Sequence, residues 1–582
     1  MTGYESRKWM ILVATIWIQA FTGTNFDFSA YSSELKAVLG ISQVQLNYLA
    51  TASDLGKALG WSSGLALMYM PLWSVMFVAA FMGLFGYGIQ WLIILDFVSL
   101  PYFVVFFLCL LAGSSITWFN TVCFVLCIKN FPSNRPLALA LTVSFNGVSA
   151  ALYNLAAISL NPSSTHIYLL LNAFIPLLTS IVSLIPILRQ PPVDPLPSDS
   201  IKHEQLIFVL LNFLAIITGF YLLFVHSNDL STARVIFCGA ILLLVLPLGI
   251  PGIIYARDWF QRKVFSSFTL QGSGFLLVDD DDLEFHREFL SRENSQISVT
   301  SYGVNGDGPT LTLSLTRFIG SNGDGDEGCC GKMIGEDQLF MLGQEHKAEM
   351  LVKRVDFWLY YFAYFCGGTI GLVYSNNLGQ IAQSLGHTSM TSTLITLYSS
   401  FSFFGRLLSA APDFIRLKFY FARTGWLAIA LVPTPIAFFL VAASGNEAAL
   451  QAGTALIGLS SGFIFAAAVS ITSELFGPNS VGVNHNILIT NIPIGSLVYG
   501  FLAALIYDRN AAAAAAGFAT FSIQMVNDSV VCMGRKCYFS TFIWWGCLAI
   551  LGLVSSVLLF LRTRPAYERF EQNRRISLSL ME

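Results

Sequence analysis

The chain is a succession of long apolar segments, each close to the roughly 20 residues that a helix needs to cross a bilayer. Only 11% of the residues are charged, against about 25% in a soluble domain, so most of the surface must face lipid. The sequence therefore predicts an all-α, polytopic membrane protein with about 14 transmembrane helices. The segments lie near residues 9–31, 43–68, 71–94, 101–128, 136–160, 166–188, 205–226, 233–255, 355–380, 389–411, 421–443, 449–473, 482–507 and 539–561.

The spacing of these segments divides the chain into five parts. We expect an N-terminal six-helix half over 1–200, two inserted transmembrane helices over 201–256 and a C-terminal six-helix half over 353–565. Residues 257–352 are rich in Gly, Ser, Asn and Asp, which predicts a disordered cytoplasmic linker. Residues 566–582 form a cytoplasmic tail.

Lys and Arg residues mark one side of the predicted membrane. They concentrate in alternate loops and in the C-terminal tail, whereas the other loops hold only Lys36, Arg234, Arg509, Arg535 and Lys536. This asymmetry places both termini in the cytoplasm. The last outer loop then carries an N-glycosylation acceptor at Asn527. It also carries Cys532 and Cys537, which are either a small disulfide or two unrelated thiols.

The two halves share short similar segments in the same order. Tyr31-Ser32 is similar to Tyr374-Ser375, "DLGKALG" (54–60) to "FFGRLLS" (403–409), and 130–153 to 475–499. Such a repeat predicts two related helix bundles.

Several longer segments carry a family resemblance. "SDLGKALGWSSGLALMY" and "GLFGYGIQWL" in the first half, and "IGEDQLFML", "SNNLGQIAQSLG", "NHNILITNIPIGSLVYGFLAALIYD" and "RKCYFSTFIWW" later, resemble the plant nodulin-like branch of the major facilitator superfamily, the nuclear-fusion-defective relatives. The resemblance covers nearly the whole chain apart from 257–352. It implies two six-helix bundles around a central cavity, with two extra helices between them, and it does not supply a substrate.

Arg406 is the main candidate for substrate binding. A charged group in the middle of a membrane helix costs about 2.5–3.5 kcal/mol on insertion scales, so such groups usually mark a pathway or a structural pair. A guanidinium offers a fork suited to carboxylate or phosphate. The segment resembles the matching helix of oxalate and monocarboxylate transporters, which implies contact with a substrate carboxylate. The alternative is an ion pair with an acid of the other half.

Lys57 occupies the related helix of the first half, and Asp54 shares its face three residues earlier. Lys57 is either a second cation for an anionic substrate or half of a neutralised pair. Asp54 joins Asp27, His485 and Asp413 as candidates for proton coupling or gating. Asp27 lies in the outer part of the first span, His485 and Asp413 near inner ends of theirs. Plain hydration is the alternative for Asp27.

Four uncharged polar or aromatic residues complete the candidate substrate-binding set. Asn376 and Gln380 are four residues apart on one helix face, where they line the cavity or join helices. Tyr31 and Tyr374 are candidate cavity rims, with simple packing as the alternative.

Signatures of soluble enzymes are missing from the sequence: it has no Walker phosphate loop, no H-E-x-x-H, and no G-x-S-x-G in a strand context. We therefore expect no enzyme, no cofactor, no metal site and no nucleic-acid partner.

The favoured function is secondary active or facilitative transport of a small solute, an organic anion, by alternating access, with protons as a candidate coupling ion and a monomer as the working unit. The alternatives are a neutral or cationic solute, including a metal, and a receptor or scaffold that does not transport. Plasma membrane, vacuole and endoplasmic reticulum stay open.

Overall fold

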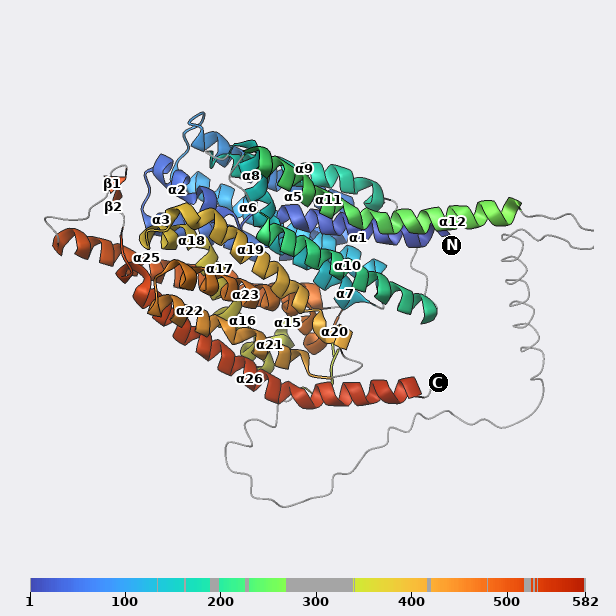
Figure 1. The fold of residues 1–582 in the computed structure, drawn as a ribbon. Coiled ribbons are helices and arrows are strands. Elements are labelled where there is room, and N and C mark those ends of the chain that lie inside the picture. Colours follow the sequence, from blue (N-terminus) through green and yellow to red (C-terminus); the bar gives the residue numbers. More distant parts are fainter. Residues whose placement is uncertain are drawn as a thin grey trace, which may run out of the picture. The chain divides into compact units, whose positions relative to one another are not determined.

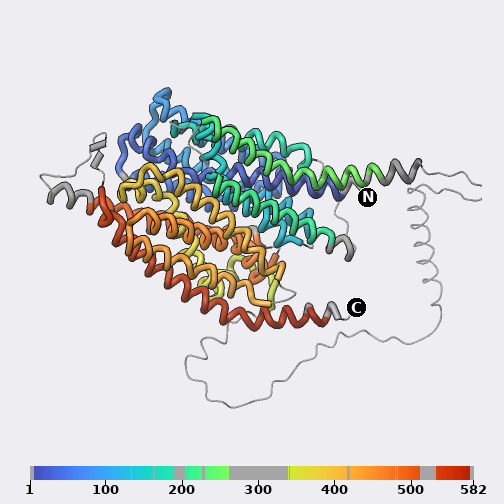
Figure 2. The backbone as a smooth tube through the Cα atoms, viewed as in Figure 1, coloured from blue at the N-terminus to red at the C-terminus, as the bar shows by residue number. Residues whose placement is uncertain are grey.

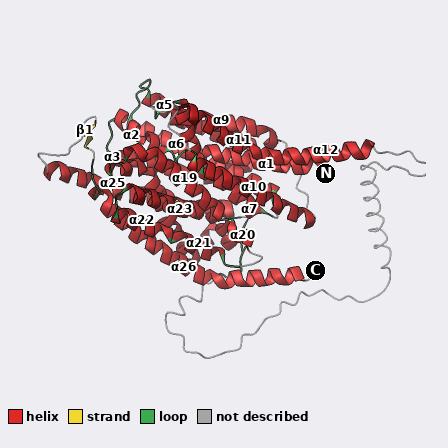
Figure 3. Cartoon of the chain, in the orientation of Figure 1, coloured by secondary structure: helices red, strands yellow, loops and turns green. Residues whose placement is uncertain are grey.

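The structure is a computed structural model, and nearly all of the chain that it describes is helical (Figure 3). The described residues are 2–132, 134–161, 164–188, 198–225, 230–267, 339, 341–415, 420–478, 480–517, 525–526, 529–530 and 532–579. They fall into two compact units, Tyr4–Pro251 with Asp337–Glu582, and Met1–Gly3 with Gly252–Glu336. The first of these units contains both helical halves.

The helices run in chain order from blue to red in Figure 1. The N-terminal half is formed by α1 (Thr2–Thr22), α2 (Phe28–Leu39), α3 (Gln43–Ala58), α4 (Trp61–Tyr69), α5 (Leu72–Ile94), α6 (Tyr102–Asn130), α7 (Arg135–Gly147), α8 (Ser149–Leu160) and α9 (Ile167–Leu188). The inserted segment holds α10 (Ser198–Phe224), α11 (Leu230–Val245), the 3₁₀ turn η1 (Leu246–Leu248) and α12 (Gly249–Ser267).

The C-terminal half follows a short helix, α15 (Ala348–Leu351). It is formed by α16 (Val355–Tyr364), a π-helical turn η2 (Phe365–Thr369), α17 (Ile370–Asn376), α18 (Leu378–Ser384), the 3₁₀ turn η3 (Thr388–Met390), α19 (Thr391–Leu408), α20 (Ala411–Ile415), α21 (Arg423–Leu431), α22 (Pro433–Ala443), α23 (Glu447–Phe476), α24 (Val481–Ile489), α25 (Asn491–Gly517) and α26 (Lys536–Ser579). The short antiparallel strands β1 (Met525–Val526) and β2 (Ser529–Val530) pair Met525 with Val530 and Val526 with Ser529.

Eleven helical stretches of the described chain are long and apolar enough to cross a membrane, so the protein is a multi-pass membrane protein. The expected count of 14 stays a prediction. Three expected spans, 9–31, 43–68 and 355–380, are built from shorter helices with breaks between them. The break between α1 and α2 falls on residues 23–27, where Gly23 begins a polar turn in an otherwise apolar helix.

Side-chain size follows the lipid environment in helix α5. Its buried face carries small residues such as Ala79, Ala80 and Gly83, whereas Phe81 and Phe85 point outward and are exposed. Small residues allow helix backbones to approach closely in a membrane, where burial of large apolar groups gives no advantage over contact with lipid.

The strongest sign of a structural repeat is a pair of glycine contacts that occurs in both halves. A Cβ atom on Gly56 of α3 would overlap the Leu110 carbonyl of α6, and one on Gly113 of α6 would overlap the Ser53 carbonyl of α3. In the C-terminal half, Gly405 of α19 meets Leu459 of α23, and Gly462 of α23 meets Ser402 of α19, in the same way. These eight residues keep one constant spacing along the chain, so the match of "DLGKALG" with "FFGRLLS" is in correct structural register and Lys57 is the counterpart of Arg406.

The first helix of each half also breaks in the same way. Asp27, which precedes α2, has φ −98° and ψ 4°, and Asn377, which precedes α18, has φ −99° and ψ 4°. Tyr31 follows its break, whereas Tyr374 precedes the other break. The sequence match of Tyr31 with Tyr374 is therefore wrong, because it aligns residues on opposite sides of the two breaks.

The two halves meet along a seam, the surface on which α2, α3, α7 and α8 of the N-terminal half pack against α18, α25 and α19 of the C-terminal half. The blue-to-cyan and yellow-to-red parts of the tube lie side by side in Figure 2. Helix α10 packs on both α7 and α19. Its Glu204 forms a buried ion pair with Lys8 of α1 and accepts a hydrogen bond from Asn134 Nδ2 (2.8 Å).

Much of the expected linker 257–352, including 268–338, lies outside the described residues. Its end differs from the expected disorder, because residues 341–352 are folded against the C-terminal half. The Gly343 N–H donates to the Glu474 carbonyl (2.7 Å), and the His346 N–H donates to the Phe476 carbonyl (3.1 Å). These bonds satisfy carbonyls at the end of α23, where the helix leaves them without internal partners.

Candidate functional site

Arg406 lies on α19 at the seam. Gly405 lets α19 pack closely on α23, and the next side chain turns toward the N-terminal half. The Arg406 side chain is buried, with 4% of the residue exposed. Its Nη1 donates to the Val143 carbonyl (3.2 Å) and to Asn146 Oδ1 (3.1 Å), both on α7. The guanidinium of one half is thus held by the backbone and an amide of the other half.

Two aromatic rings flank the same guanidinium. Its central carbon lies 5.4 Å from the ring centroid of Phe26 and 5.5 Å from that of Phe465. Phe26 belongs to the break between α1 and α2, and Phe465 to α23. A cation over an aromatic face gains about 2 kcal/mol when it is removed from water, so these rings partly replace the lost hydration.

Arg406 has no described carboxylate within the 4.0 Å that defines an ion pair. Its Nε is buried and has no hydrogen-bond partner in the described part of the chain. Neutral contacts therefore hold this buried cation, and one edge of its fork is left without an acceptor. The alternative of an ion pair with an acid of the other half is not what the structure shows.

Lys57 has the opposite surroundings. Its Nζ lies 2.5 Å from Asp54 Oδ1, and both residues are buried, at 7% and 1% exposure. The other Asp54 oxygen accepts a hydrogen bond from Ser496 of α25, across the seam. The structure therefore favours the neutralised pair over a free second cation.

Asp27 is the second buried charge-bearing group without an opposite charge nearby. It is fully buried, and both carboxyl oxygens accept from Asn172 Nδ2 of α9, at 3.1 and 3.0 Å. The titratable groups around it are the phenols of Tyr31, Tyr87, Tyr153 and Tyr168, from α2, α5, α8 and α9. No described Lys, Arg or His forms an ion pair with it.

A small cavity lies beside these groups, with a volume of about 20 Å³. Its lining combines Asp54 and Tyr31 with Asn25 from the α1–α2 break and Asn376 from the α17–α18 break. A cavity of this size holds about one water molecule. The structure thus brings Tyr31, Asp54 and Asn376 of the predicted site together around a cavity that is too small for a larger solute.

Gln380 and Tyr374, the other predicted uncharged residues, are not among the residues that line this cavity. Gln380 donates from Nε2 to Ser32 Oγ across the seam (3.4 Å), while its Oε1 is buried without a described partner. Tyr374 is bonded to Thr454 Oγ1 (2.7 Å) and packs on Phe438 inside the C-terminal half. That position matches the packing alternative for Tyr374.

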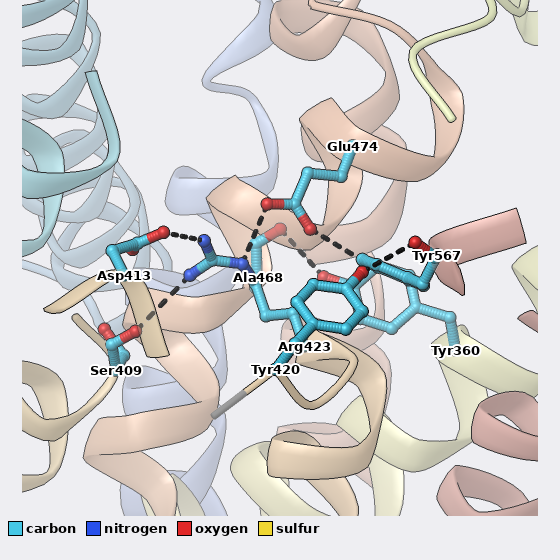
Figure 4. A network of polar contacts seen from close by, with 8 residues as sticks. All are labelled: Tyr360, Ser409, Asp413, Tyr420, Arg423, Ala468, Glu474 and Tyr567. Atoms are coloured by element: carbon cyan, nitrogen blue, oxygen red, sulfur yellow. Dashed lines mark hydrogen bonds and ion pairs between the residues drawn. The ribbon is translucent and has the colours of Figure 1, made fainter. Parts of the chain in front are cut away.

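Asp413 belongs to a separate network at one end of the C-terminal half (Figure 4). Arg423 lies between Asp413 (2.8 Å) and Glu474 (2.9 Å), and the Tyr567 hydroxyl donates to Glu474 (2.7 Å). A cavity of about 230 Å³ adjoins the network, lined by this half and by the folded segment around Leu342. The network lies within one half, so its ion pairs do not connect the two halves.

The remaining predicted residues lie apart from Arg406. His485, on α24, has a buried Nδ1 without a described hydrogen-bond partner. The Cys532 and Cys537 sulfurs are bonded to each other. Asn527 lies outside the described residues. Among the described residues, no group of three His, Cys, Asp or Glu side chains gathers as metal ligands would.

The sequence did not single out the residues that surround Arg406, Asp27 and Asp54. Asn172, Asn146 and Ser496 are polar residues within apolar spans, a signal that the sequence did contain. Phe26 and Phe465 gave no such signal, because the chain has 49 Phe residues and nothing in their local sequence separates a ring on a cation from a ring in lipid.

Comparisons with known proteins cover almost the whole chain. Residues 8–252 match the model of the family described as Nodulin-like, and residues 340–569 match that of the NFD4 C-terminal domain. The protein NUCLEAR FUSION DEFECTIVE 4 of Arabidopsis thaliana is 57% identical over 570 residues, which is 98% of this chain and 91% of the relative.

Similar solved structures include the xylose transporter XylE from E. coli in a partially occluded inward-open conformation (9% identity, TM-score 0.47, 94% of this chain and 97% of that one). They also include a bacterial homologue of the human drug peptide transporters PepT1 and PepT2 (11% identity, TM-score 0.49, 97% and 100%). The two family models and the near-full-length relative show that the chain belongs to the nodulin-like family.

Proposed function

We propose that this protein is a secondary active or facilitative transporter that moves a small organic anion across the membrane by alternating access, with Arg406 as the group that binds the anion. One observation carries the proposal: Arg406 is buried at the seam between two related halves and has no described carboxylate to neutralise it.

Removing a guanidinium from water without an opposite charge is expensive, and the carbonyl, amide and rings around Arg406 offset only part of that cost. An anion on the free Nε edge would complete the compensation through charge-assisted hydrogen bonds. An anion-binding site requires a cation whose charge is fully compensated only when the anion is bound.

The repeat supports the transport mechanism. Two halves with matching helix contacts can rock against each other about a central site, which then faces one side of the membrane at a time. Arg406 bonds to α7 of the opposite half, so an anion bound there lies where the halves separate. Asn376, Gln380 and Tyr31 would offer uncharged contacts to the rest of the solute.

The test is uptake by proteoliposomes containing the purified protein and variants of it. Arg406→Ala should reduce uptake of the transported anion at least about 30-fold, since truncating one partner of a buried charged contact costs about 2–5 kcal/mol. Arg406→Lys should restore part of the activity. Arg564→Ala is the matched control, because Arg564 is exposed and forms only a surface pair with Glu568. Uptake of the anion by the Arg406→Ala variant at the rate of the wild-type protein would contradict the proposal.

Asp27 supports a role for protons in the same cycle. A fully buried carboxyl held by one amide, with no described cation, is suited to take up and release a proton as its surroundings change. Asp27→Asn should abolish the response of uptake to an imposed pH gradient. An unchanged response would exclude Asp27 as the proton carrier.

A cationic solute is the second candidate function, because the uncompensated Asp27 favours a cation as Arg406 favours an anion. Parallel uptake assays with organic anions, organic cations and divalent metals in the same vesicles separate the two. Cation uptake that depends on Asp27 and survives Arg406→Ala would support this second candidate and contradict the first.

A further inference from the structure

From the charges along the seam, we infer that the transported anion is a monocarboxylate, carrying one negative charge, and not a dicarboxylate or a phosphate monoester. This inference rests on the proposed function and narrows its substrate class.

Lys57 and Arg406, which both lie at the seam, are structural counterparts. Lys57 follows Gly56 and Arg406 follows Gly405, and these two glycines make equivalent close contacts in their own halves. A repeat related by an axis along the membrane normal places counterparts at equal depth. The architecture therefore has room for two cations around one solute, which would suit a dianion.

The N-terminal position is already neutralised. Asp54 Oδ1 lies 2.5 Å from Lys57 Nζ, and Asp54 Oδ2 accepts a hydrogen bond from the Ser496 hydroxyl across the seam. The counterpart of Asp54 in the C-terminal half is Phe403, which has no charge and packs on Phe145 of α7. Of these two counterparts, Arg406 is the one left with a charge that an anion can compensate.

A second negative charge on the solute would not find a compensating cation at the Lys57 position, because Asp54 already neutralises Lys57. A like charge without compensation in such a site costs several kcal/mol. A phosphate monoester carries about −1.5 to −2 charges at neutral pH, so its uncompensated second charge excludes it as a substrate. A carboxylate fits the guanidinium fork of Arg406 and carries a single charge.

The rings of Phe26 and Phe465 extend this argument to the uncharged part of the solute. They lie on the guanidinium itself, so a carboxylate on Arg406 would have aromatic walls beside it. We therefore expect an apolar or aromatic body next to the single carboxylate.

The experiment compares matched probes with one or two carboxylates on the same skeleton: butyrate with succinate, and benzoate with phthalate. Each is tested as a substrate and as a competitor in proteoliposomes, at a mildly alkaline pH where every carboxyl is ionised. Wild-type protein should prefer the monoanion of each pair by at least about tenfold. Equal or stronger binding of the dianions would overturn the inference while leaving the proposed function standing.

A variant pair tests the cause of the preference. Asp54→Asn keeps the size of the side chain and frees Lys57, so the preference for the monoanion should fall by about tenfold or more. Asp54→Asn combined with Lys57→Gln removes both charges and should restore the preference ratio. A preference unchanged in Asp54→Asn protein would overturn the inference. If that variant does not fold, the wild-type comparison decides.

Failure of the proposed function has a separate signature. If wild-type protein transports and binds none of the four probes nor any other organic anion, and Arg406→Ala changes nothing, the anion proposal itself fails and the inference fails with it. Transport of anions regardless of their number of charges overturns only the inference.

Discussion

Lys57 and Arg406 occupy equivalent places in two halves built alike, yet their electrostatic surroundings are opposite. Both follow a glycine that packs one helix of the half against another. Lys57 forms an ion pair with Asp54, and the second oxygen of that carboxylate accepts a hydrogen bond from Ser496. Arg406 contacts a carbonyl, an amide oxygen and two rings, with no described carboxylate. The comparison teaches that a repeated backbone fixes where a cation lies, while single neighbouring residues decide whether it can serve an anion.

The residue three positions before each cation makes this difference. It is Asp54 in the first half and Phe403 in the second, and in a helix residues three apart share a face. An acid there neutralises the cation before a solute arrives. Phe403 carries no charge, and its buried ring packs on Phe145 of α7.

The most damaging change should be to give Arg406 the partner that Lys57 has. Phe403→Asp is expected to neutralise Arg406 and to reduce anion uptake by at least about 30-fold. Phe403→Asn is the matched control, since it loses the same packing without adding a charge. Uptake should therefore be lower in the Asp variant than in the Asn variant. Equal uptake by the two would show that the charge of Arg406 is not what matters.

Removing Lys57 should lower the free energy of unfolding more than removing Arg406. Lys57→Met leaves Asp54 buried without its partner and should destabilise the protein by about 3–5 kcal/mol. Arg406→Met strands no described carboxylate, so its cost should be clearly smaller. Thermal unfolding of the purified variants in one detergent measures both. A larger loss for Arg406→Met would mean that Arg406 has a partner acid after all.

The glycines should respond alike, because the backbone is what the halves share. Gly56→Ala and Gly405→Ala each place a methyl group against a carbonyl of the neighbouring helix, and overpacking of this kind costs about 1–3 kcal/mol. Thermal unfolding should show similar losses for both. A loss at only one glycine would contradict the repeat.

The smallest effect should come from the hydrogen bond that crosses the seam to the neutralised pair. Ser496→Ala removes one donor to Asp54 and should cost about 1.5 kcal/mol, the lower end of the range for a hydrogen bond to a charged group. The ion pair with Lys57 remains, so the monoanion preference should stay unchanged. A marked shift in that preference would show that Ser496, and not Lys57, controls the charge of Asp54.

The sequence by itself determined the features that depend on local composition and spacing. Its apolar segments predicted membrane-spanning helices, and "DLGKALG" with "FFGRLLS" placed Lys57 and Arg406 in related helices. The longer segments identified the nodulin-like family, which the comparisons confirm. These predictions succeed because bilayer thickness and close helix packing act on each helix separately.

Only the tertiary structure decided which charges are compensated. Asp54 was visible three residues from Lys57, but Ser496 reaches it from α25, and Asn172 reaches Asp27 from α9. The structure also corrected the match of Tyr31 with Tyr374. Tyr31 follows the helix break at Asp27, whereas Tyr374 precedes the helix break at Asn377. The physical reason is that the energy of a buried charge depends on every group within a few ångströms of it, and folding brings those groups from distant parts of the chain.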